Sequence, residues 1–272
     1  MVFSSELEAF VQHVDQAFDR ERVSTFWPLE SALRKLLAGP FATQALNQQL
    51  RELVANPAYT GAWRPNQLML HRGRGFALSI HLYEASRRYV HSQPFLAMVA
   101  PLAGAPLAYA RYELPAEYRN DVFNPALRIH TPQIGEVAVG ELLCLHSDRY
   151  LYDFHIEAPV PMLRLSTAPF HSLEWLFNRE TGYAWQANDS EITATQLRVA
   201  AYILGKLADP SSVEPLKQLS EHPHHAVRWA AVQSLGRINR SAAVERLQAS
   251  VDDPHPHIRR AAAKTLAQLK DS

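Results

Sequence analysis

Histidine and carboxylate side chains recur at strand spacing in short stretches of this chain. In "RYVHSQPF", His91 and Gln93 lie two residues apart, so a strand would point both side chains to one face. In "YLYDFHIEA", Asp153 and His155 share a face in the same way, and "LLCLHS" contains His146. Imidazole and carboxylate groups are the ligands that Fe(II) and other borderline divalent metals favour. These residue types raise the hypothesis of a metal site built from strands.

The stretch around His155 can be arranged in two ways. Its two faces are Asp153, His155 and Glu157 on one side and Tyr150, Tyr152, Phe154 and Ile156 on the other. The second set is more apolar and would ordinarily face the core, which would leave His155 outside or at a rim. If His155 faces inward instead, it could share a metal with His91. The alternative for each histidine is an ordinary hydrogen bond in or beside the core.

Three further side chains are candidates for a substrate pocket. Tyr150 and Tyr152 suit either a packed core or a pocket for an apolar or planar ligand. Gln93 is a poor ligand for a borderline metal, so its amide is better suited to bonding a bound water or a substrate. No residue of the chain stands out as a catalytic acid, base or nucleophile, and Cys144 in its apolar stretch is expected to be a buried thiol.

Composition narrows the classes of protein that fit. The 272 residues include 27 Lys and Arg against 27 Asp and Glu, which argues against a general nucleic-acid binder. One cysteine excludes an intramolecular disulfide framework and a cysteine zinc cluster. No apolar run approaches the ~20 residues of a membrane span, and the first residues lack the pattern of a signal peptide. We therefore expect a cytoplasmic protein that binds neither nucleic acid nor membrane.

The elements that would position these side chains fall into three regions. Residues 1–56 show apolar side chains at helical spacing and predict a helical cover. Residues 57–192 contain eight or nine short apolar or alternating runs separated by Pro, Gly, Asn and Asp, which is typical of an all-β sandwich or barrel. Residues 193–272 are helical again. The predicted fold class is a multidomain α+β protein.

The last region repeats itself. "VRWAAVQSLGRI" and "IRRAAAKTLAQL" are offset by 31 residues, and "LRVAAYILGKL" is a third copy with one residue deleted. Paired amphipathic helices with small residues at their crossings describe an α-solenoid. The repeat resembles the short form of the HEAT repeat, the form also found in phycobilisome-lyase-like proteins. That resemblance implies a stacked-helix surface that docks a protein partner.

Two features of the repeats have structural explanations. An arginine precedes each alanine pair, at Arg198, Arg228 and Arg259, and we expect it to bond a loop aspartate or helix carbonyls. The alternative is a basic strip for an anionic partner. The histidines of "HPHH" and "DPHPH" lie in equivalent turns, where turn chemistry explains them better than a metal-binding loop does.

The order of the first two regions resembles the cupin superfamily, in particular its cysteine-dioxygenase-like branch. The residues that carry the resemblance are helices, then "YVHSQPFLAMVAPLAGAPLAYARYEL", a Pro-rich loop, and "GEVAVGELLCLHSDRYLYDFHIEAPVPMLRLST". The resemblance implies an antiparallel β-barrel holding one divalent metal, most often Fe. It matches His91 to the first ligand position and Gln93 to the second. The third position falls near Arg149 or Tyr150, so His146 and His155 are the nearest candidate ligands, and we expect a degraded or rebuilt site.

Two functions follow from these patterns. The first is a mononuclear metal-dependent oxygenase or related oxidoreductase that acts on a small, amino-acid-like substrate. The second is a non-catalytic cupin-like module that senses a ligand or binds a protein through the HEAT surface. The missing ligands favour the second, whereas His91 and the aromatic-rich strands favour the first.

Overall fold

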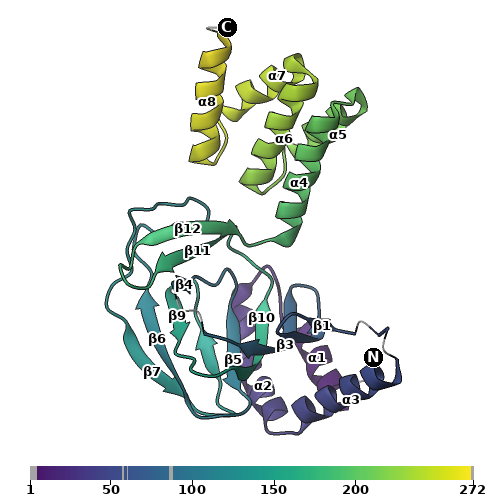
Figure 1. The fold of residues 1–272 in the computed structure, drawn as a ribbon, viewed down its shortest axis with the longest axis vertical. Coiled ribbons are helices and arrows are strands. Elements are labelled where there is room, and N and C mark those ends of the chain that lie inside the picture. The colour runs from purple at the N-terminus through teal and green to yellow at the C-terminus, as the bar shows by residue number, and fades with distance from the viewer. Residues whose placement is uncertain (1–4, 57, 60, 86–87, 271–272) are drawn as a thin grey trace. The chain divides into compact units, whose positions relative to one another are not determined.

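The computed structural model describes residues 5–56, 58–59, 61–85 and 88–270. They divide into two compact units (Figure 1). The β unit comprises Met1–Tyr118, Asn124–His171 and Trp175–Gln186, and the helical unit comprises Arg119–Phe123, Ser172–Glu174 and Ala187–Ser272. Each unit has its own apolar clusters.

The β unit begins with helices. Their bounds are α1 Ser5–Ala17, the 3-10 helix η1 Val23–Leu29, α2 Glu30–Leu37 and α3 Phe41–Ala55. Apolar residues at helical spacing, among them Leu7, Phe10 and Val14, bury one face of these helices. These helices pack on the largest sheet through one apolar cluster, which contains Leu33 from α2 and Leu78 from the sheet.

Twelve strands follow among the described residues. Their bounds are β1 Trp63–Arg64, β2 Gln67–Arg72, β3 Phe76–Tyr83, β4 Tyr89–His91, β5 Ala97–Pro101, β6 Leu107–Glu113, β7 Gln133–Val137, β8 Leu143–Leu145, β9 Tyr150–Phe154, β10 Val160–Thr167, β11 Leu173–Asn178 and β12 Ala184–Asp189. They form three sheets, in the orders β1-β2-β3-β10-β5-β8, β12-β11-β4 and β7-β6-β9. The pairings β1–β2, β2–β3, β3–β10, β10–β5, β5–β8, β4–β11, β6–β7 and β6–β9 are antiparallel.

The largest sheet separates two apolar layers. Alternate residues of β5 and β10 face opposite sides, as the period of two requires. Met98 and Leu163 pack toward the helices, whereas Val99 and Met162 pack toward the sheet that contains β9. Both layers are therefore built from the short alternating runs of the sequence.

The three sheets do not close into a barrel, so this part of the sequence-based prediction is wrong for the described residues. The stretch after His91 gives the physical reason. Pro94 has no backbone N–H, and it restricts Gln93 before it, so the chain cannot continue one ladder there. β4 therefore pairs with β11, whereas β5 joins the largest sheet beside β10. β4 ends at His91, so His91 and Gln93 do not share the face of one strand as expected from their spacing.

The helical unit contains the repeats. Its helices are α4 Ile192–Leu207, η2 Pro210–Ser212, α5 Val213–Leu219, α6 His225–Ile238, α7 Arg240–Ser250 and α8 Pro256–Lys270. The repeated apolar positions are buried as expected at Val227, Ala231, Leu235, Ile258 and Ala262. Ala230, Ala261 and Leu266 are half-buried.

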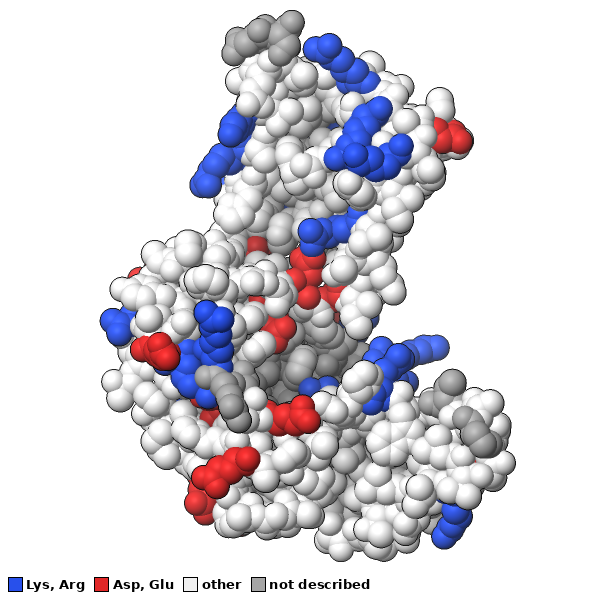
Figure 2. All heavy atoms as spheres, viewed as in Figure 1, with Lys and Arg blue, Asp and Glu red and all other residues white. Residues whose placement is uncertain are grey.

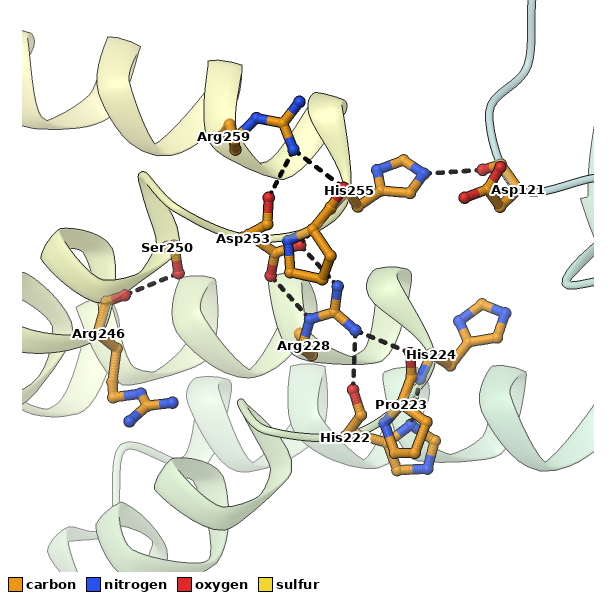
Figure 3. A network of polar contacts seen from close by, with 11 residues as sticks. Asp121, His222, Pro223, His224, Arg228, Arg246, Ser250, Asp253, His255 and Arg259 are labelled. Carbon is orange, nitrogen blue, oxygen red and sulfur yellow. Dashed lines mark hydrogen bonds and ion pairs between the residues drawn. The ribbon is translucent and has the colours of Figure 1, made fainter. Parts of the chain in front are cut away.

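Two of the three repeated arginines, Arg228 and Arg259, bond the turns between helices as expected, whereas Arg198 pairs with Asp189 at the end of β12. Arg228 forms an ion pair with Asp253 at 2.6 Å and donates to the carbonyl oxygens of His222 and Pro223 (Figure 3). Arg259 donates to the carbonyls of Asp253 and Pro254, at 2.7 and 2.9 Å. Arg228 and Arg259 therefore each satisfy polar groups of a turn that their own helix follows.

Candidate functional site

An ion pair between a buried aspartate and an exposed arginine lies at the centre of the candidate site in the β unit. Asp153, in β9, is 7% exposed, and its Oδ1 accepts from Nη2 of Arg179 at 2.6 Å. Arg179 comes directly after β11, so the pair joins two sheets that share no strand. Burial raises the pKa of the Asp153 carboxyl above its ordinary value, and Arg179 offsets only part of that effect. A perturbed, buried carboxyl of this kind is typical of functional sites.

Two of the three predicted metal ligands lie near this carboxyl. The charges of His155 and His91 both act to lower the pKa of Asp153. His91 is half-buried at the end of β4, opposite Leu176 of β11, and His155 is exposed just after β9. The β9 face that carries Asp153 and His155 is therefore the face opposite the main apolar core.

The third predicted ligand lies in a different environment. The ring of His146 is 4.2 Å from the ring of Trp27 in η1, measured between centroids. Its backbone N–H is 3.4 Å from the hydroxyl of Tyr152. His146 thus belongs to the side of the β unit that packs on the N-terminal helices, and it does not join His91 and His155.

Two of the three predicted pocket residues pack together, because the ring centroids of Tyr150 and Tyr152 are 6.5 Å apart. Tyr152 is 4% exposed, and its hydroxyl donates to the carbonyl of Cys144 at 3.2 Å. Tyr150 is half-buried, with the guanidinium carbon of Arg111 4.6 Å from its ring centroid. The Oε1 atom of Gln93 is buried without a hydrogen-bond partner among the described residues. Both tyrosines pack in or against the apolar layer between sheets.

The arrangement does not fit an iron site. Within the part of the chain that the structure describes, no group of three or more His, Cys, Asp or Glu side chains is placed to hold a metal ion. The Asp153 carboxylate, whose pKa responds to the charges of His91 and His155, already carries the guanidinium of Arg179, and that positive charge would repel a divalent ion. Cys144 offers no alternative ligand, because burial and Glu30 raise the pKa of its thiol to about 11.

Arg179 also lines a polar cavity that sequence reasoning missed. The cavity has a volume of about 300 Å³, and its polar lining includes Tyr112, Arg128, His130, Arg179 and Thr181. Burial and the charge of Asp153 raise the pKa of Tyr112, so its phenol keeps its proton at neutral pH. A second cavity of about 360 Å³ lies on the Asp153 side of Arg179 and includes His155.

Backbone and side-chain hydrogen bonds hold the two segments that form the polar cavity. The N–H of Ile129 donates to the carbonyl of Gly182 at 2.9 Å, and Nε of Arg128 donates to the carbonyl of Thr181 at 2.9 Å. The side chain of Asn178 accepts from the N–H groups of Glu180 and Thr181. The turn that carries Arg179 is thus fixed against the segment that carries Arg128.

The cavity has the chemistry of an anion-binding site. Arg128 and Arg179 present planar guanidinium donors, the groups best matched to carboxylate and phosphate oxygens. Glu180 is the acidic side chain in its lining. The sequence gives little indication of this cavity, because Arg128 and Arg179 lie 51 residues apart (179 − 128) and outside any regular strand pattern.

Comparison with known proteins identifies the repeats. Residues 193–267 match the family of HEAT repeats, as the sequence predicted. No curated protein matches the chain. Among the residues that the structure describes, no helix is long and apolar enough to cross a membrane.

Several solved structures are similar in part. Among them is a sugar phosphate isomerase from a cupin superfamily, from Silicibacter pomeroyi, with 14% sequence identity and a TM-score of 0.24. The match covers 48% of this chain and 83% of that chain. At that score the likeness carries no argument about the fold or chemistry of this protein.

Proposed function

We propose that the β unit binds a small molecule bearing a carboxylate or a phosphate, in the cavity lined by Arg128 and Arg179. The observation that carries the proposal is the presence of both guanidinium groups in one cavity of about 300 Å³. Arg179 uses Nη2 for Asp153, and Arg128 uses Nε for Thr181, so each retains further N–H donors for a ligand. An anion that bridged them would gain two charge-assisted contacts.

A docking role for the HEAT array completes the proposed function. Stacked-helix repeats create extended surfaces that bind other proteins. The match of residues 193–267 to HEAT repeats supports such a role. The chain would then combine a ligand-binding unit with a protein-docking unit. No observation on the described residues favours the oxygenase interpretation over this one.

Titration of the full chain with simple anions tests the ligand-binding part. We expect inorganic phosphate, pyrophosphate or citrate to bind by isothermal titration calorimetry and to raise the unfolding temperature. Arg128→Gln should weaken the affinity by about tenfold, the size of one lost charge-assisted contact. Glycerol, which has no charge, should not bind.

Arg149→Gln is the matched control. Arg128 and Arg149 each lie over a tyrosine ring, at 5.3 and 5.5 Å from the centroid, and only Arg128 lines the cavity. The control should keep wild-type affinity. Equal responses of the two variants, or no heat and no stabilisation with any of the three anions, would refute the proposal.

A further inference from the structure

A groove in the helical unit has an apolar lining. It has a volume of about 570 Å³ and lies among α6, α7 and α8. Its apolar side chains are Trp229, Val232, Ala243, Val244, Leu247 and Leu269. All three helices belong to the segment that matches HEAT repeats or end directly after it. The groove is thus part of the array and needs nothing from the β unit.

The charged side chains of the groove are all of one sign. Arg237 at the end of α6 and Arg240 at the start of α7 line it, together with the uncharged Gln233 and Thr265. No Asp or Glu appears among its lining residues. The groove therefore combines an apolar floor with two neighbouring positive charges.

These two arginines lack the carboxylate partner that three other arginines of the array have. Ion pairs hold Arg198 to Asp189, Arg228 to Asp253 and Arg246 to Glu221. For Arg237 and Arg240, the described residues supply no carboxylate within ion-pair distance. Arg237 instead lies with its guanidinium carbon 5.2 Å from the ring centroid of Tyr202.

The visible face of the array has the same bias. On the face that Figure 2 shows, the charged side chains of the array helices are mostly Lys and Arg, with little Asp or Glu. The chain as a whole has no net charge. The positive character is therefore local to this part of the surface, which favours a specific acidic partner over general attraction to polyanions.

We propose that the groove binds an amphipathic helical segment of a partner protein that carries Asp or Glu beside its apolar stripe. Apolar side chains at helical spacing would fill the groove between α6, α7 and α8, in the way that amphipathic helices bind hydrophobic grooves. The carboxylates would reach Arg237 and Arg240. This inference rests on the proposed docking role of the HEAT array and names the chemistry of the partner.

A displayed library of amphipathic helical peptides tests the inference on the full chain. The library holds one apolar stripe constant and varies the flanking positions among acidic, uncharged and basic residues. We expect the selected peptides to be acidic, and to bind the chain with the double substitution Arg237→Glu and Arg240→Glu at least about tenfold more weakly by fluorescence anisotropy. Arg260→Glu, an exposed position of α8 outside the groove lining, is the charge-matched control and should leave affinity unchanged.

The possible outcomes separate the inference from the docking role. Selection of basic or uncharged peptides, or equal binding to the double variant, would overturn the inference and leave the docking role standing. Failure to select any peptide would overturn both. Self-association of the wild-type chain that the double variant abolishes, measured by sedimentation, would identify a second copy as the occupant and also overturn the inference. Each variant must also unfold at the wild-type temperature, which shows that a loss of peptide binding does not come from a loss of folding.

Discussion

Arg228 binds both carboxylate oxygens of Asp253, through Nε at 2.8 Å and Nη2 at 2.6 Å. The two residues lie 25 positions apart, so the contact joins one repeat of the array to the turn of the next (Figure 3). Both side chains are largely buried, with 13% and 8% of their surface exposed. A buried charge that loses its partner is costly, because neither water nor another group replaces the lost contacts.

Removal of this arginine should therefore destabilise the helical unit. We expect Arg228→Ala to lower the free energy of unfolding by about 3 kcal/mol, measured by urea denaturation followed by circular dichroism. Arg246→Ala is the matched control, because the Arg246–Glu221 pair also spans 25 residues but leaves Glu221 68% exposed. The control should cost less than about 1 kcal/mol. Similar losses for both variants would show that burial does not set the strength of the Arg228 pair.

A stack of histidines should make the stability of the helical unit depend on pH. The ring of His225 lies parallel to that of His255, with centroids 3.8 Å apart, and the ring of His224 also stacks with that of His225, with centroids 5.0 Å apart. Burial, then the charges of His255, His224 and Arg228, lower the pKa of His225 to about 4, although Asp121 acts in the opposite direction. The ring is therefore neutral in the folded chain at pH values where an unfolded histidine is already protonated.

The sign of the pH dependence follows from this lowered pKa. Above about pH 6.5, His225 is neutral in both states and has no effect. As the pH falls from 6.5 to about 4, the unfolded chain binds a proton that the folded chain excludes, so stability falls. His225→Gln should reduce the loss of unfolding temperature across that interval, whereas His13→Gln, at an exposed position of α1, should not. An identical pH profile for His225→Gln and the wild type would contradict this expectation.

The helical repeats were predictable because their information is local. A helix pair and its turn occupy about 31 residues, and the apolar, small and arginine positions recur with that offset. Burial of Ala231 and Ala262, and the contacts of Arg228 and Arg259, follow from that pattern alone. Periodicity did not reveal which apolar faces stay exposed. Leu46 and Leu50 form a helical stripe on α3, yet 37% and 59% of their surfaces are exposed.

The candidate site was less predictable because it depends on contacts between sheets. The alternation of side chains along the strand correctly assigned Asp153 and His155 to the face opposite the apolar face of β9. It could not reveal that Arg179, in a turn after another strand, would form an ion pair with Asp153. Nor could it reveal that Pro94 would place β4 and β5 in different sheets. Long-range pairing of this kind has no signature at a fixed spacing.

Metal content is the measurement that separates the two functions predicted from the sequence. We expect the purified chain to carry no stoichiometric metal by elemental analysis, because Arg179 already neutralises the carboxylate beside His91 and His155. Fe(II) added without oxygen should not raise the unfolding temperature, and His91→Ala should behave as the wild type in that assay. Stoichiometric metal that disappears in His91→Ala would revive the oxygenase prediction.

A side chain at Gly182 should destabilise the turn that carries Arg179. This glycine has a φ of +75°, and a Cβ atom there would lie 2.6 Å from the carbonyl oxygen of Ile129, which belongs to the opposite wall of the anion cavity. Gly140 is the matched control, since its φ is +79° and a Cβ there would meet nothing within 4 Å. Both alanine variants bear a backbone strain of about 1–2 kcal/mol, but only Gly182→Ala must also push two segments apart. We therefore expect Gly182→Ala to lose more stability in urea than Gly140→Ala and to weaken anion binding, while Gly140→Ala keeps wild-type affinity. Equal stability losses, or anion affinity unchanged in Gly182→Ala, would show that the contact between these two segments does not shape the cavity.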